Sequence, residues 1–159
     1  MPKMTLDRTD RRILEQLQAD GRLSNQELAE RVLLSPSPCL RRVRALERAG
    51  VIQRYAALLD PLRVGLELLA YVTVKLEKRG KMPVDQFTRA VQSWPEVISC
   101  FSMTGDMDYL MRVQVENLEH YSRFVMDKLL KQAGVIDIRT NFVLERIKET
   151  TALPLEHLS

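Results

Sequence analysis

The chain has 159 residues, a formal net charge of +3 at pH 7, and 45% hydrophobic and 28% charged residues. These values are typical of a globular protein with one domain or two small ones, and they exclude a transmembrane protein because no apolar run is long enough to span a bilayer. The first residues lack the apolar core of a secretory signal, so we expect a cytoplasmic protein.

The positive charge lies in the first part of the chain. Through Asp60 there are eleven basic and eight acidic residues, whereas the remainder has thirteen of each. We expect this distribution if the first part meets nucleic acid and the second does not. Two scattered histidines and two scattered cysteines, Cys39 and Cys100, offer no metal-ligand spacing, so we expect no metal site and two reduced core thiols.

Three short helices are predicted before residue 51. The first begins with Asp7 as its N-cap. The second begins with a capping box, in which the side chains of Ser24 and Glu27 each bond the other's backbone N–H. The third runs from Ser35, whose side chain is expected to cap it, to Gly50, which supplies the left-handed residue that ends it.

The third helix is predicted to have two opposed faces. At about 100° per residue, an apolar stripe of Cys39, Val43 and Leu46 lies opposite an arginine-rich face. Few acids are placed to pair with these arginines, and guanidinium forks match phosphates and guanine edges, which favours a DNA recognition helix over a merely solvated face. The predicted DNA-binding residues are Ser35, Ser37, Pro38, Arg41, Arg42, Arg44, Arg48 and Arg54.

The segment after the third helix, Val51–Leu59, is rich in β-branched and apolar residues and ends at Asp60–Pro61. This composition predicts a strand or wing. Residues 1–60 are therefore predicted to form a winged helix-turn-helix, the DNA-binding domain, and residues 61–65 are the expected hinge.

Beyond the hinge, alternating apolar residues over 68–76 mark a strand. The expected order is strand, helix, strand, strand, helix, strand, which is the split βαβ pattern. It predicts an α+β fold, a ferredoxin-like βαββαβ sandwich, over residues 66–150. Residues 151–159 are expected to form a C-terminal tail. One sheet face stays uncovered, so we expect at least a homodimer. The other expected elements are a turn at Arg79–Lys81, a helix through Val84, Phe87, Val91 and Trp94, strands at Val97–Met103 and Tyr109–Val115, a helix from the Asn117 cap to Gly134 with Leu118, Tyr121, Val125 and Leu129 along one side, and a strand over Ile136–Leu144.

Three stretches carry a resemblance to a known family: residues 6–14 (LDRTDRRIL), 34–47 (LSPSPCLRRVRALE) and 105–110 (GDMDYL). In this order they make the chain similar to the Lrp/AsnC, or feast/famine, family of transcription regulators, closest to its leucine-responsive members. The resemblance implies a winged helix-turn-helix, an αβ sandwich that dimerises, and further assembly into tetramers, octamers or larger discs. It also implies an amino-acid effector bound between dimers.

The loop Thr104–Tyr109 is the predicted effector site, although Gly and Asp are also the residues of an ordinary hairpin turn. An α-amino acid needs an anionic acceptor for its ammonium and free N–H donors for its carboxylate, and this loop offers both. The resemblance places the last strand beside the loop at the dimer–dimer contact, and apolar residues there favour leucine or methionine. The predicted effector-binding residues are Thr104, Gly105, Asp106, Met107, Asp108, Tyr109, Thr140, Phe142 and Val143.

Two other functions are alternatives. Sirohaem decarboxylases share this fold and would place histidines and arginines around a porphyrin, but only His120 and His157 are available here. A basic helix could also bind an acidic protein surface, whereas DNA binding would weaken log-linearly with salt. We expect a non-enzymatic regulator without a cofactor, whose partners are double-stranded DNA, a small amino acid and copies of itself, with no membrane.

Overall fold

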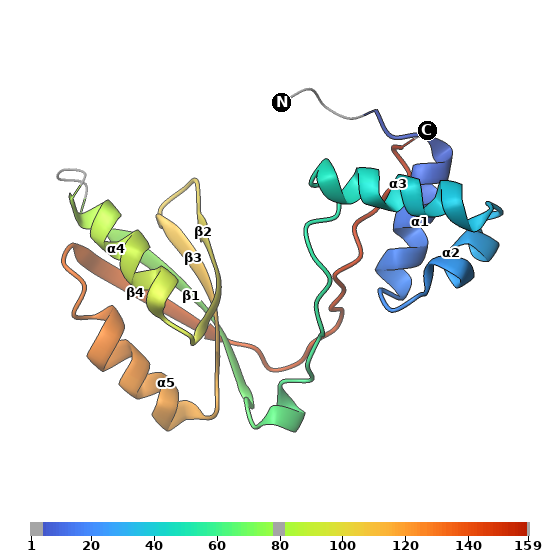
Figure 1. The fold of residues 1–159 in the computed structure, drawn as a ribbon. Helices are drawn as coiled ribbons and strands as arrows, with labels where there is room; N and C mark the ends of the chain where they lie inside the picture. The colour runs from blue at the N-terminus through green and yellow to red at the C-terminus, as the bar shows by residue number, and fades with distance from the viewer. Residues whose placement is uncertain (1–4, 78–81, 159) are drawn as a thin grey trace. The chain divides into compact units, whose positions relative to one another are not determined.

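A computed structural model describes residues 5–77 and 82–158. The chain forms two compact units, each with its own core (Figure 1). One unit comprises the chain through Leu58 together with the segment from Lys148, and the other comprises Leu59–Ile147. The turn expected at Arg79–Lys81 lies outside the described residues. The chain therefore passes from one unit to the other twice, after Leu58 and after Ile147.

The first unit is built on α1 (Arg8–Ala19), α2 (Asn25–Val32) and α3 (Pro36–Arg48). The predicted start of α1 is confirmed, because the Asp7 carboxylate accepts the backbone N–H groups of Thr9 and Asp10, each at 2.8 Å. The capping box of α2 is also confirmed: the backbone N–H groups of Ser24 and Glu27 donate to each other's side chains at 2.8 and 3.2 Å. Side chains thus satisfy donors that the first turn of each helix leaves free.

The C-terminal end of α3 agrees with the prediction, whereas the N-terminal end differs from it. Gly50 has a φ of +72° and follows the helix as expected. Ser35 occupies the N-cap position, but its side chain makes no capping bond, so this part of the prediction is wrong. One of the two N–H groups that such a cap can bind, that of the third helical position, is missing because Pro38 stands there.

The core of this unit lies between the three helices. The C-terminal segment, expected to be a tail, packs against that core through Leu155 and Leu158. Gln18 of α1 donates to the carbonyl of Leu153 at 3.1 Å and accepts its N–H at 2.7 Å. Apolar burial and paired hydrogen bonds thus make this segment part of the first unit. The buried apolar residues of the core are Ile13, Leu14, Leu28, Ala29, Val32, Cys39, Val43 and Leu46.

The segment after α3 carries no strand in the described chain, so of the strand or wing predicted over Val51–Leu59 the strand is wrong. A strand needs a second strand to pair its backbone N–H and C=O groups, and the described part of this unit contains none. The segment is instead tied to α3 by the hydroxyl of Tyr55, which donates to Glu47 Oε1 at 3.1 Å. Its apolar residues Leu58 and Leu59 are exposed.

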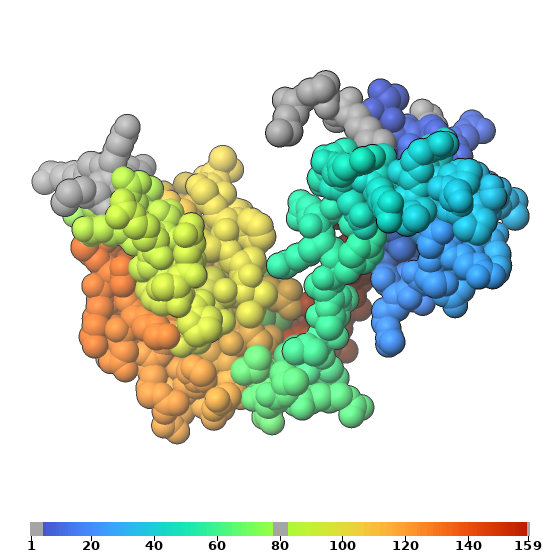
Figure 2. All heavy atoms as spheres, in the orientation of Figure 1, coloured from blue at the N-terminus to red at the C-terminus, as the bar shows by residue number. Residues whose placement is uncertain are grey.

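The second unit confirms the predicted order of strands and helices. Its four strands form one antiparallel sheet in the order β2-β3-β1-β4. Helices α4 and α5 cover one face of the sheet (Figure 1), and their atoms form a continuous layer (Figure 2). This is the expected ferredoxin-like α+β arrangement. The bounds are β1 Leu68–Leu76, α4 Met82–Ser93, β2 Val97–Ser102, β3 Tyr109–Val115, α5 Leu118–Phe124 and β4 Val135–Phe142, with a 3-10 turn at Leu62–Val64 and a π-helical turn at Val125–Leu129.

Alternate residues of the sheet pack under the two helices. Ala70 and Val74 of β1 are fully buried beside Phe87 of α4 and Phe124 of α5. Of the four residues expected along one side of this unit's second helix, Tyr121 and Leu129 are buried, but Leu118 is 61% exposed. It is the first residue of α5, directly after the Asn117 cap, whose side chain accepts the His120 N–H at 2.9 Å. The wide π-helical turn after Phe124 changes the 3.6-residue period only for the residues that follow it.

Arg42 joins α3 to the start of α1. Its Nη1 atom lies 2.8 Å from Asp7 Oδ2 and 2.8 Å from Asp10 Oδ1. Asp10 is buried, and both carboxylates raise the pKa of Arg42. The pKa of Asp7 lies below its ordinary value because the Asp10 backbone N–H, and then Arg42, donate to its carboxylate. The rotation of α3 about its axis is thus fixed by an ion pair as well as by its apolar stripe.

We predict that Arg42→Gln lowers the free energy of unfolding by about 1–3 kcal/mol, because Asp10 would keep a buried carboxylate without a cation. The value lies below that for fully buried pairs because 36% of the Arg42 side chain is exposed. Urea denaturation followed by circular dichroism measures the change. The Asp7 contribution is present above pH 3.8 and should be lost as the pH falls through the lowered pKa of the folded state.

Arg41→Gln is the matched control, since Arg41 forms no ion pair with a described residue. Its free energy of unfolding should stay within about 0.5 kcal/mol of the parent value. If the Arg42 and Arg41 variants were equally stable, the ion pair would not hold α3 in place.

Candidate nucleic-acid interface and ligand loop

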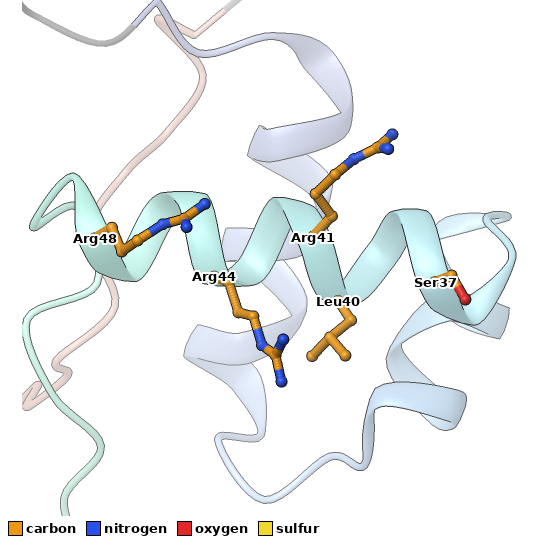
Figure 3. A pocket seen from close by; sticks show the side chains of 5 residues that line it. All are labelled: Ser37, Leu40, Arg41, Arg44 and Arg48. Atoms are coloured by element: carbon orange, nitrogen blue, oxygen red, sulfur yellow. The ribbon is translucent and has the colours of Figure 1, made fainter.

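The exposed face of α3 forms a shallow hollow of about 260 Å³. The opposite face of the helix packs into the core, so the two faces predicted from the sequence are present. Figure 3 shows Leu40 and Arg44 projecting to one side of the helix and Arg41 to the other. The residues that line the hollow are Ser37, Leu40, Arg41, Arg44 and Arg48.

Three guanidinium groups of this face, those of Arg41, Arg44 and Arg48, form no ion pair within the described part of the chain. Each keeps its N–H donors for an external acceptor. Planar guanidinium forks bind phosphate oxygens and the guanine edge with two parallel hydrogen bonds. The face can therefore hold a polyanion and can also distinguish bases.

The other predicted DNA-binding residues lie outside the hollow. The Arg42 guanidinium forms ion pairs with Asp7 and Asp10 at the start of α1, whereas the three exposed arginines of the hollow form none within the described chain. Ser35 and Pro38 lie at the start of α3, and Arg54 lies in the extended segment after it. Leu40 lines the hollow although the sequence did not single it out. Its position one turn before an arginine of the exposed face is the signal that could have found it.

The loop between β2 and β3 is closed by Asp108. Its backbone N–H donates to the Val74 carbonyl at 3.0 Å, and its carbonyl accepts the Met103 N–H at 2.8 Å. Its carboxylate oxygen Oδ2 accepts the backbone N–H of Leu76 at 2.7 Å. Asp108 therefore fastens the loop to β1, and the same carboxylate already has a partner within the chain.

The tip of the loop comprises Thr104, Gly105 and Asp106, all exposed. Gly105 has a φ of +111°, a conformation that favours glycine, and apart from its two chain neighbours no residue has an atom within 4 Å of the place where a Cβ would stand. The backbone of the tip is thus open to a ligand, and Asp106 supplies an exposed carboxylate beside it.

Two further residues of the predicted effector site lie behind the tip. Met107 is half-buried. Tyr109 is buried, with its ring centroid 4.8 Å from that of Phe87 on α4, and burial raises the pKa of its hydroxyl. Tyr109 therefore anchors the loop in the core of the unit.

The last strand does not reach this loop within one chain. β1 lies between β3 and β4 in the sheet, which separates the end of β3 from β4 by about 10 Å. Thr140 shares a hydrogen bond with the Tyr121 hydroxyl, and the Phe142 ring packs 5.2 Å from that of Tyr121, so both face the helices. Val143 follows the end of β4. A single copy therefore does not assemble all the predicted effector residues.

Neither His120 nor His157 is part of a metal-ligating cluster among the described residues. His120 Nε2 lies 3.6 Å from Glu96 Oε1, which also accepts Lys128 Nζ at 2.6 Å, and His157 is exposed. Burial raises the pKa of Glu96, but the donors around it, chiefly Lys128, bring it below its ordinary value. The described residues contain no cluster of three metal-ligating side chains. Among the helices described, none has the length and apolar character needed to cross a membrane.

Two family models match the chain. One, the Lrp/AsnC ligand binding domain, matches residues 69–153, and the other, a winged helix-turn-helix DNA-binding model, matches residues 6–53. The leucine-responsive regulatory protein of Escherichia coli K12 is 44% identical over 155 residues, which are 98% of this chain and 94% of that protein.

Two solved structures are similar over nearly the whole chain. A transcriptional regulator of Neisseria meningitidis in complex with L-methionine is 51% identical, with a TM-score of 0.95 and coverage of 98% of this chain and 100% of that one. An AsnC family transcriptional regulator of Agrobacterium tumefaciens is 38% identical, with a TM-score of 0.91 and coverage of 97% and 100%. These relatives are regulators, which gives no support to an enzyme similar to sirohaem decarboxylases. Because both units match in the same order, the chain belongs to the Lrp/AsnC family of DNA-binding transcription regulators.

Proposed function

We propose that this protein regulates transcription in the cytoplasm by laying the exposed face of α3 in the major groove of duplex DNA. The observation that carries the proposal is the set of three guanidinium groups without ion pairs in the described chain, placed opposite the stripe that packs in the core. With 13 residues, α3 is about 20 Å long, and an α-helix fits the width of the major groove.

The residues of this face divide into two roles. Recognition helices contact base edges mainly through their N-terminal part, so we assign Ser37, Arg41 and Arg44 to the bases or the phosphates beside them. Arg48, at the end of α3, and Arg54, after it, are assigned to the phosphate backbone. Arg42 is left out of the interface because its guanidinium is already paired with Asp7 and Asp10.

We predict that replacing both Arg41 and Arg44 by alanine weakens DNA binding. Each lost arginine–base contact should cost about 1–3 kcal/mol and relax the sequence preference, whereas a lost phosphate contact should weaken all sequences alike and reduce the salt slope by about 1. Fluorescence anisotropy over a salt series measures both effects. Arg89→Ala, an exposed arginine of α4 in the other unit, is the matched control and should change nothing. Wild-type affinity in the double variant would rule out this face.

We further propose a homodimer through the uncovered face of the sheet. Tyr71 and Phe101 are 39% and 55% exposed there, and Leu110 lies directly across from Phe101 in the sheet register. Exposed apolar side chains on a sheet face are commonly buried against a second copy. A twofold protein matches two half-sites on one side of the duplex, so DNA binding would depend on assembly, and dimers would join into tetramers or octamers.

Phe101→Asp should shift the protein toward its 18.4 kDa monomer, because the second copy would have to bury a carboxylate. Sedimentation velocity at micromolar concentration measures the change. Met126→Asp is the control: Met126 is 61% exposed but lies on the helical side, in the π-helical turn. If the Phe101 variant sedimented like the parent, the sheet face would not be the dimer interface.

We propose an apolar amino acid, such as leucine or methionine, as the effector. The relative from Escherichia coli is named leucine-responsive, and the Neisseria structure contains L-methionine. The open backbone of the loop tip can donate to a carboxylate, and Asp106 can accept from an ammonium group. Thr140, Phe142 and Val143 would come from a neighbouring copy. Binding would then span subunits and shift the assembly, and through it the affinity for DNA.

Asp106→Asn should abolish the heat of leucine or methionine binding in calorimetric titration without changing the thermal stability, because the Asp106 side chain is exposed. Asp108→Ala should lower the thermal stability, because it leaves the Leu76 N–H without its acceptor, whereas Asp108→Asn keeps an acceptor oxygen and should restore it. Unchanged heat in Asp106→Asn, or no heat with any of the twenty amino acids, would argue against this loop.

A further inference from the structure

Leu40 is the only apolar residue among those that line the hollow on α3. It also lines a second hollow of about 170 Å³, where its neighbours include Leu17, Leu28 and Tyr55. The residue is half-buried. One part of its side chain thus closes the edge of the core, and the other part lies on the basic face.

The helical period places Leu40 at the margin of that face. At about 100° per residue it lies about 40° from Arg44 and about 60° from Ser37 around the helix axis. Residues four apart are neighbours on a helix surface, and Figure 3 shows Leu40 and Arg44 on the same side of α3. A ligand that packs closely against this side of α3 can therefore contact both side chains.

In the major groove, the C5-methyl of thymine is the apolar group that base edges present to a side chain, and the other groups read there are hydrogen-bond donors and acceptors. A leucine pressed against a donor or acceptor removes its water without replacing the hydrogen bond, which is unfavourable. We propose that Leu40 contacts a thymine methyl and makes thymine the preferred base at its position. This inference rests on the proposed docking of α3 in the major groove.

The spacing of the two side chains restricts where the thymine lies. Leu40 and Arg44 are four residues apart, about 6 Å along the helix. Successive base pairs are about 3.4 Å apart, and arginine forks prefer guanine. With Arg44 at a guanine, the thymine lies within about two base pairs of it.

The test starts by selecting duplexes from a random pool with the wild-type protein, which gives its preferred half-site. Each thymine of that site is then replaced by uracil, which lacks only the C5-methyl. At one position of each half-site, uracil should weaken wild-type binding about fourfold in fluorescence anisotropy, the change expected for one buried methyl-sized group. The Leu40→Ala protein should bind the thymine and uracil duplexes equally, and Leu40→Met, of similar volume, should still prefer thymine.

The uracil duplexes change only the DNA, so the wild-type result does not depend on the folding of a variant. If Leu40→Ala has no cooperative thermal transition, Leu40→Val takes its place and should show a smaller preference for thymine than the wild type. The proposal is overturned if no thymine is sensitive to loss of its methyl, or if the alanine or valine variant keeps the full sensitivity. A wild-type protein that selects no sequence would overturn the proposed function instead, which distinguishes the two failures.

Discussion

The ion pair between Arg42 and the two aspartates at the start of α1 decides which basic face α3 presents. Four arginines fall within residues 41–48, so the helix could expose more than one basic surface. Pairing Arg42 inside the unit removes it from the exposed set and leaves Arg41, Arg44 and Arg48 around one hollow. Here an internal charge pair contributes to conformational specificity, because any other rotation of α3 would leave the buried Asp10 without its cation.

Elements whose signals are local could be predicted closely from the sequence. The N-caps Asp7 and Ser24 find their partners within three residues, and the alternation along β1 reports burial directly. The cap expected at Ser35 does not form, and one of its two possible donors is missing for an equally local reason, because Pro38 has no N–H. The strand expected over Val51–Leu59 failed because a strand depends on a partner, which no local composition can supply.

In the candidate sites, too, some features depend on nearby residues and others on residues far away in the sequence. The arginine face follows from helical periodicity alone, but the removal of Arg42 from it depends on Asp10, 32 positions away. In the loop, Asp106 and Asp108 are chemically identical and two residues apart. Only the register of β1 against β3 decides that Asp108 bonds the Leu76 backbone while Asp106 stays exposed. Long-range packing thus assigns different roles to residues that look alike in sequence.

The packing of Leu155 and Leu158 against the first unit affects the order in which the two units can be completed during synthesis. The second unit is continuous from Leu59 to Ile147, so a growing chain holds all of it before the first unit is complete. Domains generally fold as they are synthesised, N-terminal first, but here two apolar residues that pack against the N-terminal helices come from the end of the chain. A nascent or proteolysed chain that stops before Leu155 therefore lacks two of the apolar side chains that pack against the core of the first unit.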